Sequence, residues 1–309
     1  MWRPLWYVGP AAARANRQGL AGASVTMLGS VGKDAPWPLD ELRKRGVRVD
    51  DVRVSEKQPT GRAFIQISSE DGENSIVLLK GANFERDAQI DEPARWLDGG
   101  QVTHLMLQNE IPLPVTEAYV RHARAQRERA DGKGHVQTIF NPSPMPSLEE
   151  LRAFPWAGVD VLVVNEGEAG DMVQALGDGA NASQDTDALA HTLAGLPALA
   201  PVPWVVVTKG ADGVIAGVQL DAGERTWFSL PSPRPKQTVN TTGAGDTFTG
   251  YLTSSLMQAH AKQQASNRET VEWVLRRATT AASMAVEVDG AMESIPALDA
   301  VEQRERTRS

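Results

Sequence analysis

The stretch VNTTGAGDTFTGYL, residues 239–252, places a carboxylate between three small residues and an apolar, helix-like run. Gly243 and Gly245 allow the backbone to turn tightly and leave its N–H groups uncovered. The run from Thr247 starts a helix, whose first amides lack partners within the helix and whose dipole favours negative charge at that end. Backbone groups alone can therefore hold an oxyanion or a phosphoryl group at this position.

Asp246, at the start of the same helix, has two interpretations. An aspartate at a helix N-terminus is an ordinary cap, worth about 0.3 to 1 kcal/mol. Alternatively, this carboxylate takes a proton from the group that attacks a bound phosphate. Two other phosphate-binding motifs are excluded. Residues 29–34 lack the first glycine and the final hydroxyl of a P-loop, and the glycines at 243, 245 and 250 do not have the dinucleotide-binding spacing.

The composition of the 309 residues is that of a folded globular chain, with 41% hydrophobic and 23% charged residues. The net charge is −8 and the basic residues are scattered, which argues against nucleic acid as a partner. There are no cysteines, so disulfides, thiolate metal ligands and thiol nucleophiles are excluded. We expect a cytoplasmic protein, with the nucleus as an alternative in a eukaryote. Because no apolar run approaches the length of a membrane span, no membrane partner is expected.

Short apolar, β-prone runs alternate with helical patterns through the middle of the chain. Strands are predicted at residues 104–107, 136–140, 159–164 and 204–208, and helices at 114–129, 166–176 and 185–196. This alternation indicates βαβ units, so the predicted fold class is α/β with a doubly wound, mostly parallel sheet. In such sheets ligands bind at the carboxyl ends of the strands.

The two ends of the chain carry different patterns. Before residue 81 we predict a strand at 24–31, a helix at 39–46 and a hairpin of strands at 60–68 and 74–79 with a turn at 69–73. After residue 246, two long helices are predicted at 247–260 and 270–286. The polar residues from 302 onward are expected to fray.

These motifs resemble the ribokinase branch of the phosphofructokinase B (PfkB) sugar-kinase family, whose late signature is Asp-Thr-x-Gly-Ala-Gly-Asp at the start of a helix. Further landmarks occur in family order: GENSI at 72–76, GAN at 81–83, QNEIP at 108–112, NPSP at 141–144, NEGE at 165–168, TKG at 208–210 and GAMESIP at 290–296. The resemblance implies a ribokinase-like, three-layer α/β kinase domain at 19–299 with a small β lid that is incomplete here and includes a hairpin at 58–82. An irregular segment at 1–18 and a polar tail at 300–309 flank it, and the hairpin is a candidate homodimer surface.

The resemblance implies an ATP-dependent sugar kinase. Ribokinase, which converts D-ribose and ATP to D-ribose 5-phosphate and ADP, is the leading hypothesis. Asp246 would be the general base that deprotonates a sugar hydroxyl, which suits a reaction that needs mainly positioning and charge stabilisation. The anion hole for the transferred phosphoryl group would consist of the amides of Gly243, Ala244, Gly245 and Asp246. The alternatives are a catalytically impaired nucleotide-binding relative and a kinase for another sugar or a nucleoside.

By the same resemblance, Asn165 and Glu168 organise magnesium and the phosphates, with Glu168 acting through water, which suits an ion that keeps several of its waters. A helix N-cap followed by acids in the first turn is the alternative. Glu110, together with Asp246, would bind the sugar, and an exposed turn acid is the alternative for Glu110. The residues implied to border the nucleotide are Asn165, Thr208, Lys209, Gly210, Gly213, Gly245 and Thr279. A plain β-turn is the alternative for the loop at 208–213.

Members of the family often bind a monovalent cation such as potassium beside the anion hole. The matching positions here are Asn240, Thr242, Ala285, Val288, Gly290 and Ser294. The family's usual aspartate at the first position is replaced by Asn240, whose amide oxygen can coordinate but which carries no charge. The five histidines have no metal-ligand spacing, so we expect them to be structural or surface residues.

The resemblance does not extend to the first residues. Chains of this family open with a strand carrying an Asn-x-Asp element and with a Gly-Gly-Lys-Gly-Ala-Asn segment, which grip the sugar. Here Arg14-Ala-Asn16 is the nearest match, and the early aspartate and double glycine are lacking. An absent strand predicts unpaired backbone groups, exposed apolar surface and lower stability. An incomplete gene model, a degenerate relative and a partner that fills the gap are the three explanations.

Overall fold

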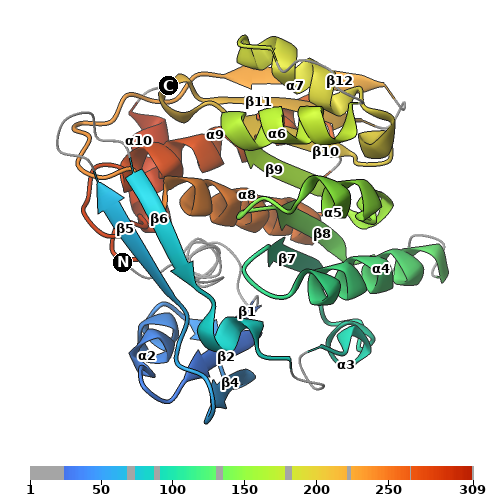
Figure 1. Cartoon of the computed structure of the whole chain (residues 1–309). Coiled ribbons are helices and arrows are strands. Elements are labelled where there is room, and N and C mark those ends of the chain that lie inside the picture. Colours follow the sequence, from blue (N-terminus) through green and yellow to red (C-terminus); the bar gives the residue numbers. More distant parts are fainter. Residues whose placement is uncertain are drawn as a thin grey trace.

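The computed structural model describes residues 24–67, 74–86, 91–129, 135–177, 183–220, 224–264 and 266–307. A six-stranded sheet forms its centre, in the spatial order β12-β11-β10-β9-β8-β7 (Figure 1). The parallel strands are β7 (His104–Gln108), β8 (Gln137–Asn141), β9 (Val161–Asn165) and β10 (Trp204–Thr208). Two antiparallel strands follow, β11 (Val214–Gln219) and β12 (Arg225–Leu230). The predicted α/β class with a mostly parallel sheet is confirmed.

Helices cover both faces of this sheet and give three layers. Successive side chains of a strand point to opposite faces. In β9, Leu162 and Val164 belong to one apolar core, while Val161 and Val163 belong to the other. The first core is completed by α4 (Leu113–Arg129), α5 (Leu148–Ala153), α6 (Glu166–Leu176) and α7 (Thr186–Ala194). The second is completed by α8 (Ala244–Ala261), α9 (Arg268–Ala285) and α10 (Leu298–Arg306).

Small paired strands occupy the first part of the described chain. β1 (Val25–Thr26) pairs with β3 (Val47–Arg48), β2 (Gly29–Gly32) with β4 (Val52–Ser55), and β5 (Arg62–Ile67) with β6 (Asn74–Leu79). Helix α2 (Trp37–Lys44) packs on a third apolar core that includes Val31 and Leu42. Figure 1 shows the hairpin β5–β6 extending away from α2, β2 and β4. Short helices complete the chain: η1 (Gly81–Phe84), α3 (Pro93–Leu97), η2 (Trp156–Gly158), η3 (Pro197–Leu199) and η4 (Gly210–Asp212).

Most predicted elements are confirmed, namely the four parallel strands, the hairpin and helices α2, α4, α6, α7, α8 and α9. The predicted strand at 24–31 is two short strands, β1 and β2, because each has its own partner. The sequence pattern does not predict β11, whose run is interrupted by Gly217, or β12; the ring of Trp227 in β12 fills the space beside that glycine. The turn at 69–73, the segment at 1–18 and Arg14-Ala-Asn16 lie outside the described residues. No helix in the described part of the chain has both the length and the apolar character needed to cross a membrane.

The expectation that the chain frays from residue 302 is wrong as far as Arg306, where α10 ends. The apolar side of α10 is buried in the second core. Arg304 donates to both carboxylate oxygens of Glu287, each at 2.9 Å, and Arg277 of α9 donates to Glu305 at 3.2 Å. These partners are distant in sequence, so a polar run near the end of the chain cannot reveal them.

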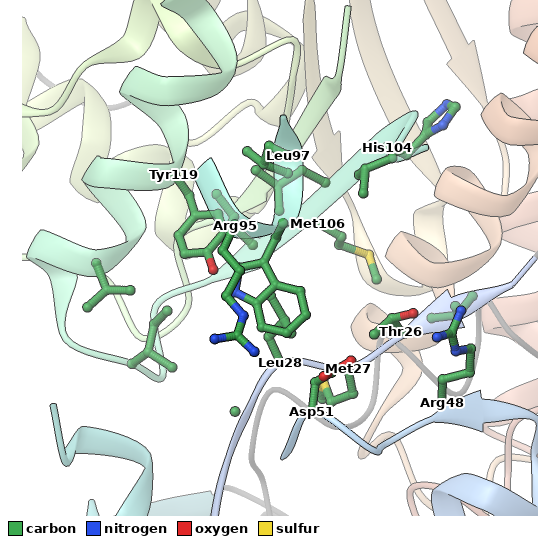
Figure 2. A pocket seen from close by; sticks show the side chains of 18 of the residues that line it. Thr26, Met27, Leu28, Arg48, Asp51, Arg95, Leu97, His104, Met106 and Tyr119 are labelled. Atoms are coloured by element: carbon green, nitrogen blue, oxygen red, sulfur yellow. The ribbon is translucent and has the colours of Figure 1, made fainter. Parts of the chain in front are cut away.

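β7 is the last strand of the sheet on one side. Within the described residues it pairs with β8 alone, and a cavity of about 600 Å³ lies between β7 and the segment that holds β1 and β2. Figure 2 shows Met27 and Leu28 on one side of this cavity and Leu97, Met106 and Tyr119 on the other. The expectation of an absent first strand concerns residues before 24, which lie outside the described part of the chain, and it stays a prediction.

Candidate active site

Four polar side chains lie next to one another at the carboxyl ends of the parallel strands. Gln108 ends β7, Asn141 ends β8, Asn165 ends β9 and Thr208 ends β10. The strand register pairs Gln108 with Asn141 and Asn165 with Thr208. Ligands of parallel α/β sheets bind at this edge. The structure therefore brings together Asn165 and Thr208, two of the predicted nucleotide-binding residues.

The amino end of α8 carries the predicted anion hole. Gly243 precedes the helix with φ 81°, a left-handed conformation that favours glycine, and a Cβ there would lie 3.3 Å from Cα of Ala291. At Gly245 an added Cβ would have no neighbour within 4 Å, so the backbone faces open space. Its place in the first turn leaves its N–H without an acceptor inside the helix. Ala244 is less available, because its N–H donates to the carbonyl of Thr241 at 3.3 Å.

Asp246 lies in the first turn of α8 and is half-buried. Nε2 of Gln108 donates to its Oδ1 at 3.0 Å, a contact between residues 138 positions apart. This contact places the predicted base at the carboxyl edge of the sheet, beside the first-turn amides of α8. A carboxylate and an anion hole in such proximity can deprotonate a hydroxyl and stabilise charge on a phosphoryl group.

Asn165 and Glu168 form a capping box at the start of α6. Oδ1 of Asn165 accepts from the N–H of Glu168 at 2.8 Å, and a carboxylate oxygen of Glu168 accepts from the N–H of Asn165 at 2.9 Å. The cap interpretation of these residues is therefore correct as local geometry. It does not account for the electrostatics of Glu168, because burial raises the pKa of its carboxyl and the nearby charge of Asp246 raises it further.

Two acids that repel each other beside a phosphate site fit a divalent cation, which would favour the charged form of both. Glu168 and Asp246 are such a pair. The part of the chain that the structure describes holds no group of three or more His, Asp or Glu side chains suited to a metal ion. Magnesium does not need such a group, since it keeps several waters and binds through phosphate oxygens and one or two carboxylates.

The loop after β10 has a tight turn geometry. Gly210 and Gly213 have φ of 52° and 105°, and a Cβ on Gly213 would lie 2.1 Å from the carbonyl oxygen of Leu230. The N–H of Lys209 donates to the carbonyl of Gly213 at 2.7 Å, and its Nζ pairs with Asp187 at 2.9 Å. The β-turn interpretation explains both glycines. The loop also follows a strand at the ligand edge, so its position beside a nucleotide stays a prediction.

Glu110 and Thr279, the predicted neighbours of sugar and adenine, have different surroundings. Glu110 is half-buried rather than exposed and lines a cavity of about 420 Å³ with Asn83 and residues of the hairpin β5–β6. Thr279 is 4% exposed, and its hydroxyl donates to the carbonyl of Leu275 within α9 at 2.7 Å. The hydroxyl of Thr279 is thus already bonded within its own helix, and its role beside adenine stays a prediction.

The predicted monovalent-cation residues come from two segments that lie together. Asn240 donates its N–H to the carbonyl of Val286 at 3.3 Å, which joins residues 239–242 to the end of α9 and the segment after it, where Ala285, Val288, Gly290 and Ser294 lie. The side-chain amide of Asn240 donates to Asp289 at 2.8 Å, and its Oδ1 accepts from the N–H of Thr242 at 2.9 Å. These hydrogen bonds from Asn240 and from the N–H of Gly290 lower the pKa of Asp289. Asp289 thereby supplies a negative charge beside the uncharged Asn240.

Sequence reasoning missed two residues of this site, Gln108 and Asp289. Gln108 lies inside the QNEIP landmark, but nothing in its spacing shows a contact with Asp246. Asp289 directly precedes the GAMESIP landmark, and an acid beside a predicted cation residue is a signal that could have found it. Its pairing with Asn240 needs the fold, because 49 positions separate the two.

The family of the chain follows from a match over nearly its whole length. The model of the pfkB family of carbohydrate kinases matches residues 9–298. The chain belongs to this family. It is therefore a phosphotransferase with a sugar hydroxyl as acceptor, as the motifs predict.

Individual relatives agree with this assignment. Over 285 residues the chain is 30% identical to the bifunctional ribokinase/ribose-5-phosphate isomerase A of Fructilactobacillus sanfranciscensis, covering 91% of this chain and 46% of that protein, about half its length. The crystal structure of ribokinase from Cryptococcus neoformans var. grubii serotype A in complex with ADP has a TM-score of 0.78 at 33% identity, over 97% of this chain and 87% of that one. The structure of Arabidopsis thaliana ribokinase complexed with ribose and ATP has a TM-score of 0.72 at 25% identity, over 96% and 85%. The predicted ribokinase-like fold is confirmed.

Proposed function

We propose that the protein is a ribokinase, which transfers the γ-phosphate of ATP to the primary hydroxyl of D-ribose. The products are D-ribose 5-phosphate and ADP. The observation that carries the proposal is the contact of Gln108 with Asp246, which sets a carboxylate at the ligand edge of the sheet beside the amides of α8. The choice of ribose and ATP is supported by similar structures of ribokinases with ADP and with ribose and ATP.

In this mechanism Asp246 accepts the proton of the sugar hydroxyl while the hydroxyl oxygen attacks the γ-phosphorus. The bond from the γ-phosphorus to the bridging oxygen breaks, and ADP leaves with that electron pair. Amides at residues 243–246 that are not bonded within the chain stabilise the charge on the phosphoryl oxygens. Asn165 and the segment 208–213 border ATP, with Gly245 in contact with its phosphates. Glu110 binds sugar hydroxyls.

Magnesium enters this proposal with ATP, held near Glu168 through water. The repulsion between Glu168 and Asp246 supports this site, because a divalent cation compensates both charges. When bound, magnesium neutralises charge on the phosphates. A monovalent cation, with potassium as the candidate, would lie between residues 239–242 and 285–294. The charge of Asp289 beside Asn240 supports that second site.

Nucleotide binding without sugar turnover is the competing proposal. The open edge of β7 favours it, because the described residues leave one side of the sheet unpaired and lined by a large cavity. A kinase of this family that acts on another sugar or a nucleoside would show itself in the acceptor panel described below.

We also propose a homodimer formed through the hairpin β5–β6. Phe64 and Val77 lie opposite each other and are 54% and 57% exposed, and Leu79 on the same face is 52% exposed. A cluster of exposed apolar side chains marks a protein contact surface. A cytoplasmic location, or a nuclear one in a eukaryote, is consistent with a sequence without cysteines.

The deciding experiment is Asp246→Asn. The amide oxygen can still accept from Gln108, so the fold and ATP binding should be kept, while kcat for ribose should fall by about 10²- to 10⁴-fold because the proton acceptor is lost. ADP release is measured with ribose, other pentoses, hexoses and nucleosides as acceptors, and ATP binding by calorimetry. Asp40→Asn, in an exposed ion pair of α2, is the control and should retain full activity.

Two results would overturn the proposal. Full activity of Asp246→Asn would remove the assigned base. ATP binding by the wild-type protein without ADP release for any acceptor would favour the competing nucleotide-binding function. Turnover of a different acceptor, with ribose inactive, would keep the mechanism and change the substrate.

A further inference from the structure

Gln108 is the only side chain of β7 shown to contact the predicted base, among the residues that the structure describes. It ends the strand, is 4% exposed and donates from Nε2 to Oδ1 of Asp246 at 3.0 Å. The orientation of its amide follows from chemistry, since a carboxylate can only accept and the NH₂ group must face it. Its Oε1 therefore faces away, and there it is buried without a hydrogen-bond partner. The one strong interaction of this buried amide is directed at Asp246.

The contact has two physical effects on Asp246. A donor fixed to Oδ1 restricts rotation of the carboxylate and so determines where its oxygens point. A hydrogen bond to the charged form also favours that form, which lowers the pKa of a carboxyl group. Glu168 acts in the opposite direction, as a like charge that interacts with Asp246 from the start of α6. Gln108 is neutral, so its hydrogen bond lowers this pKa less than a cation at the same place would.

We propose that Gln108 is a positioning residue for phosphoryl transfer, which orients the carboxylate of Asp246 through the hydrogen bond to its Oδ1. The inference rests on the proposed function, because it assigns to Gln108 the control of the proposed base. It also gives the end of β7 a role in the reaction, by connecting the central sheet to the first turn of α8.

The test compares the wild-type protein with Gln108→Leu, which keeps the volume and removes the donor. The pKa of Asp246 is measured from its carboxyl ¹³C resonance in a pH titration, with Asp246→Asn to assign the signal. We expect this pKa to rise, because the charged form loses its hydrogen bond. The acid limb of kcat against pH should move to higher pH with it. At neutral pH kcat should fall about 10- to 100-fold with the KM for ATP unchanged.

A second variant, Gln108→Glu, has the same shape and guards against a folding defect of the first. It should raise the pKa of Asp246 further, because two neighbouring carboxylates share a proton. The control is Gln258→Leu, which removes another buried glutamine of α8, 3% exposed and bonded to Arg277 at 3.4 Å. This control should lower stability and leave the pKa of Asp246 and the pH profile unchanged.

The positioning role is overturned if both variants at Gln108 behave like the control, with the pKa of Asp246 and the acid limb unmoved. A wild-type protein that phosphorylates no acceptor would refute the proposed function instead. In that case the ¹³C titration still shows whether Gln108 controls the pKa of Asp246, since it needs no turnover.

Discussion

Two aspartates, Asp160 near the amino ends of the central strands and Asp246 near their carboxyl ends, have different surroundings. At the amino ends, Asp160 precedes β9 and its side chain is 5% exposed. Its carboxylate accepts from Arg127 at 2.8 Å and from the N–H of Thr138 at 2.7 Å, and Nε2 of His135 lies 3.0 Å away. At the carboxyl ends, Asp246 accepts from the neutral amide of Gln108 and interacts with the like charge of Glu168 on α6.

The difference separates a stabilising carboxylate from a functional one. Burial raises the pKa of Asp160, but its partners are cationic or hydrogen-bond donors of the chain itself, which favour the charged form. Glu168 and Asp246 instead interact as like charges, and burial together with this repulsion raises the pKa of Glu168. Acids that repel each other at the carboxyl ends of parallel strands indicate a site that a cation and phosphates complete.

The strongest test of this contrast is Asp160→Ala. We expect the free energy of unfolding to fall by about 3 to 5 kcal/mol, because Arg127 and His135 lose their buried carboxylate. The kcat for ribose should stay unchanged in the folded fraction. Urea unfolding and ADP release measure the two quantities. Asp98→Ala is the matched control, since Asp98 also contacts a histidine and a second polar side chain but at the surface, and its loss should cost much less. A loss of turnover with stability intact would contradict the contrast.

A histidine at the amino ends of the central strands should also determine how stability depends on pH. Burial, with smaller contributions from the nearby His260 and His135, lowers the pKa of His104, the first residue of β7, to about 4. The unfolded chain binds a proton at its ordinary pKa of about 6.5. Stability is therefore present above that pH and is lost as pH falls from about 6.5 towards 4, by on the order of 3 kcal/mol.

His104→Phe should remove most of this pH dependence, because an apolar ring at the same place does not titrate. Urea unfolding of the variant and the wild type at several pH values between these limits measures it. His191→Asn, at an exposed histidine of α7, should keep the dependence of the wild-type protein. An unchanged slope in His104→Phe would show that other groups cause the loss of stability.

Gly245→Ala, at the start of α8 near the carboxyl ends of the strands, has the smallest expected effect on the protein. Stability should not fall, because no atom beyond the adjacent residues and the neighbouring backbone of α8 lies within 4 Å of the added Cβ. The methyl group would occupy the open side of the anion hole, so kcat/KM for ATP should fall about 10- to 100-fold. Gly99→Ala has equal space for a Cβ and lies outside the proposed site, so it should change neither quantity. Normal ATP kinetics in Gly245→Ala would mean that the phosphates bind elsewhere.

Much of the fold was predictable because it depends on local patterns. The runs of Val161–Asn165 and Trp204–Thr208 are apolar strands that precede polar residues, and the helices after them carry periodic apolar positions. The capping box at Asn165 was also predictable as an alternative, since both of its members lie within four residues. The end of the chain was not predictable, because α10 is held by the pairing of Arg304 with Glu287, 17 positions away.

The candidate active site was likewise predictable only in part. Gly243, Gly245 and Asp246 stand within four residues, so the sequence by itself determined a turn, a helix start with uncovered amides and a carboxylate beside them. Only the tertiary structure decided which groups meet that carboxylate. Gln108 at the end of β7 donates to Asp246, and Glu168 at the start of α6 interacts with it as a like charge. Asp289 supplies a negative charge beside the uncharged Asn240, 49 positions away in the sequence. The physical reason is that backbone turns and helix ends depend on neighbouring residues, whereas charge compensation depends on packing between distant ones.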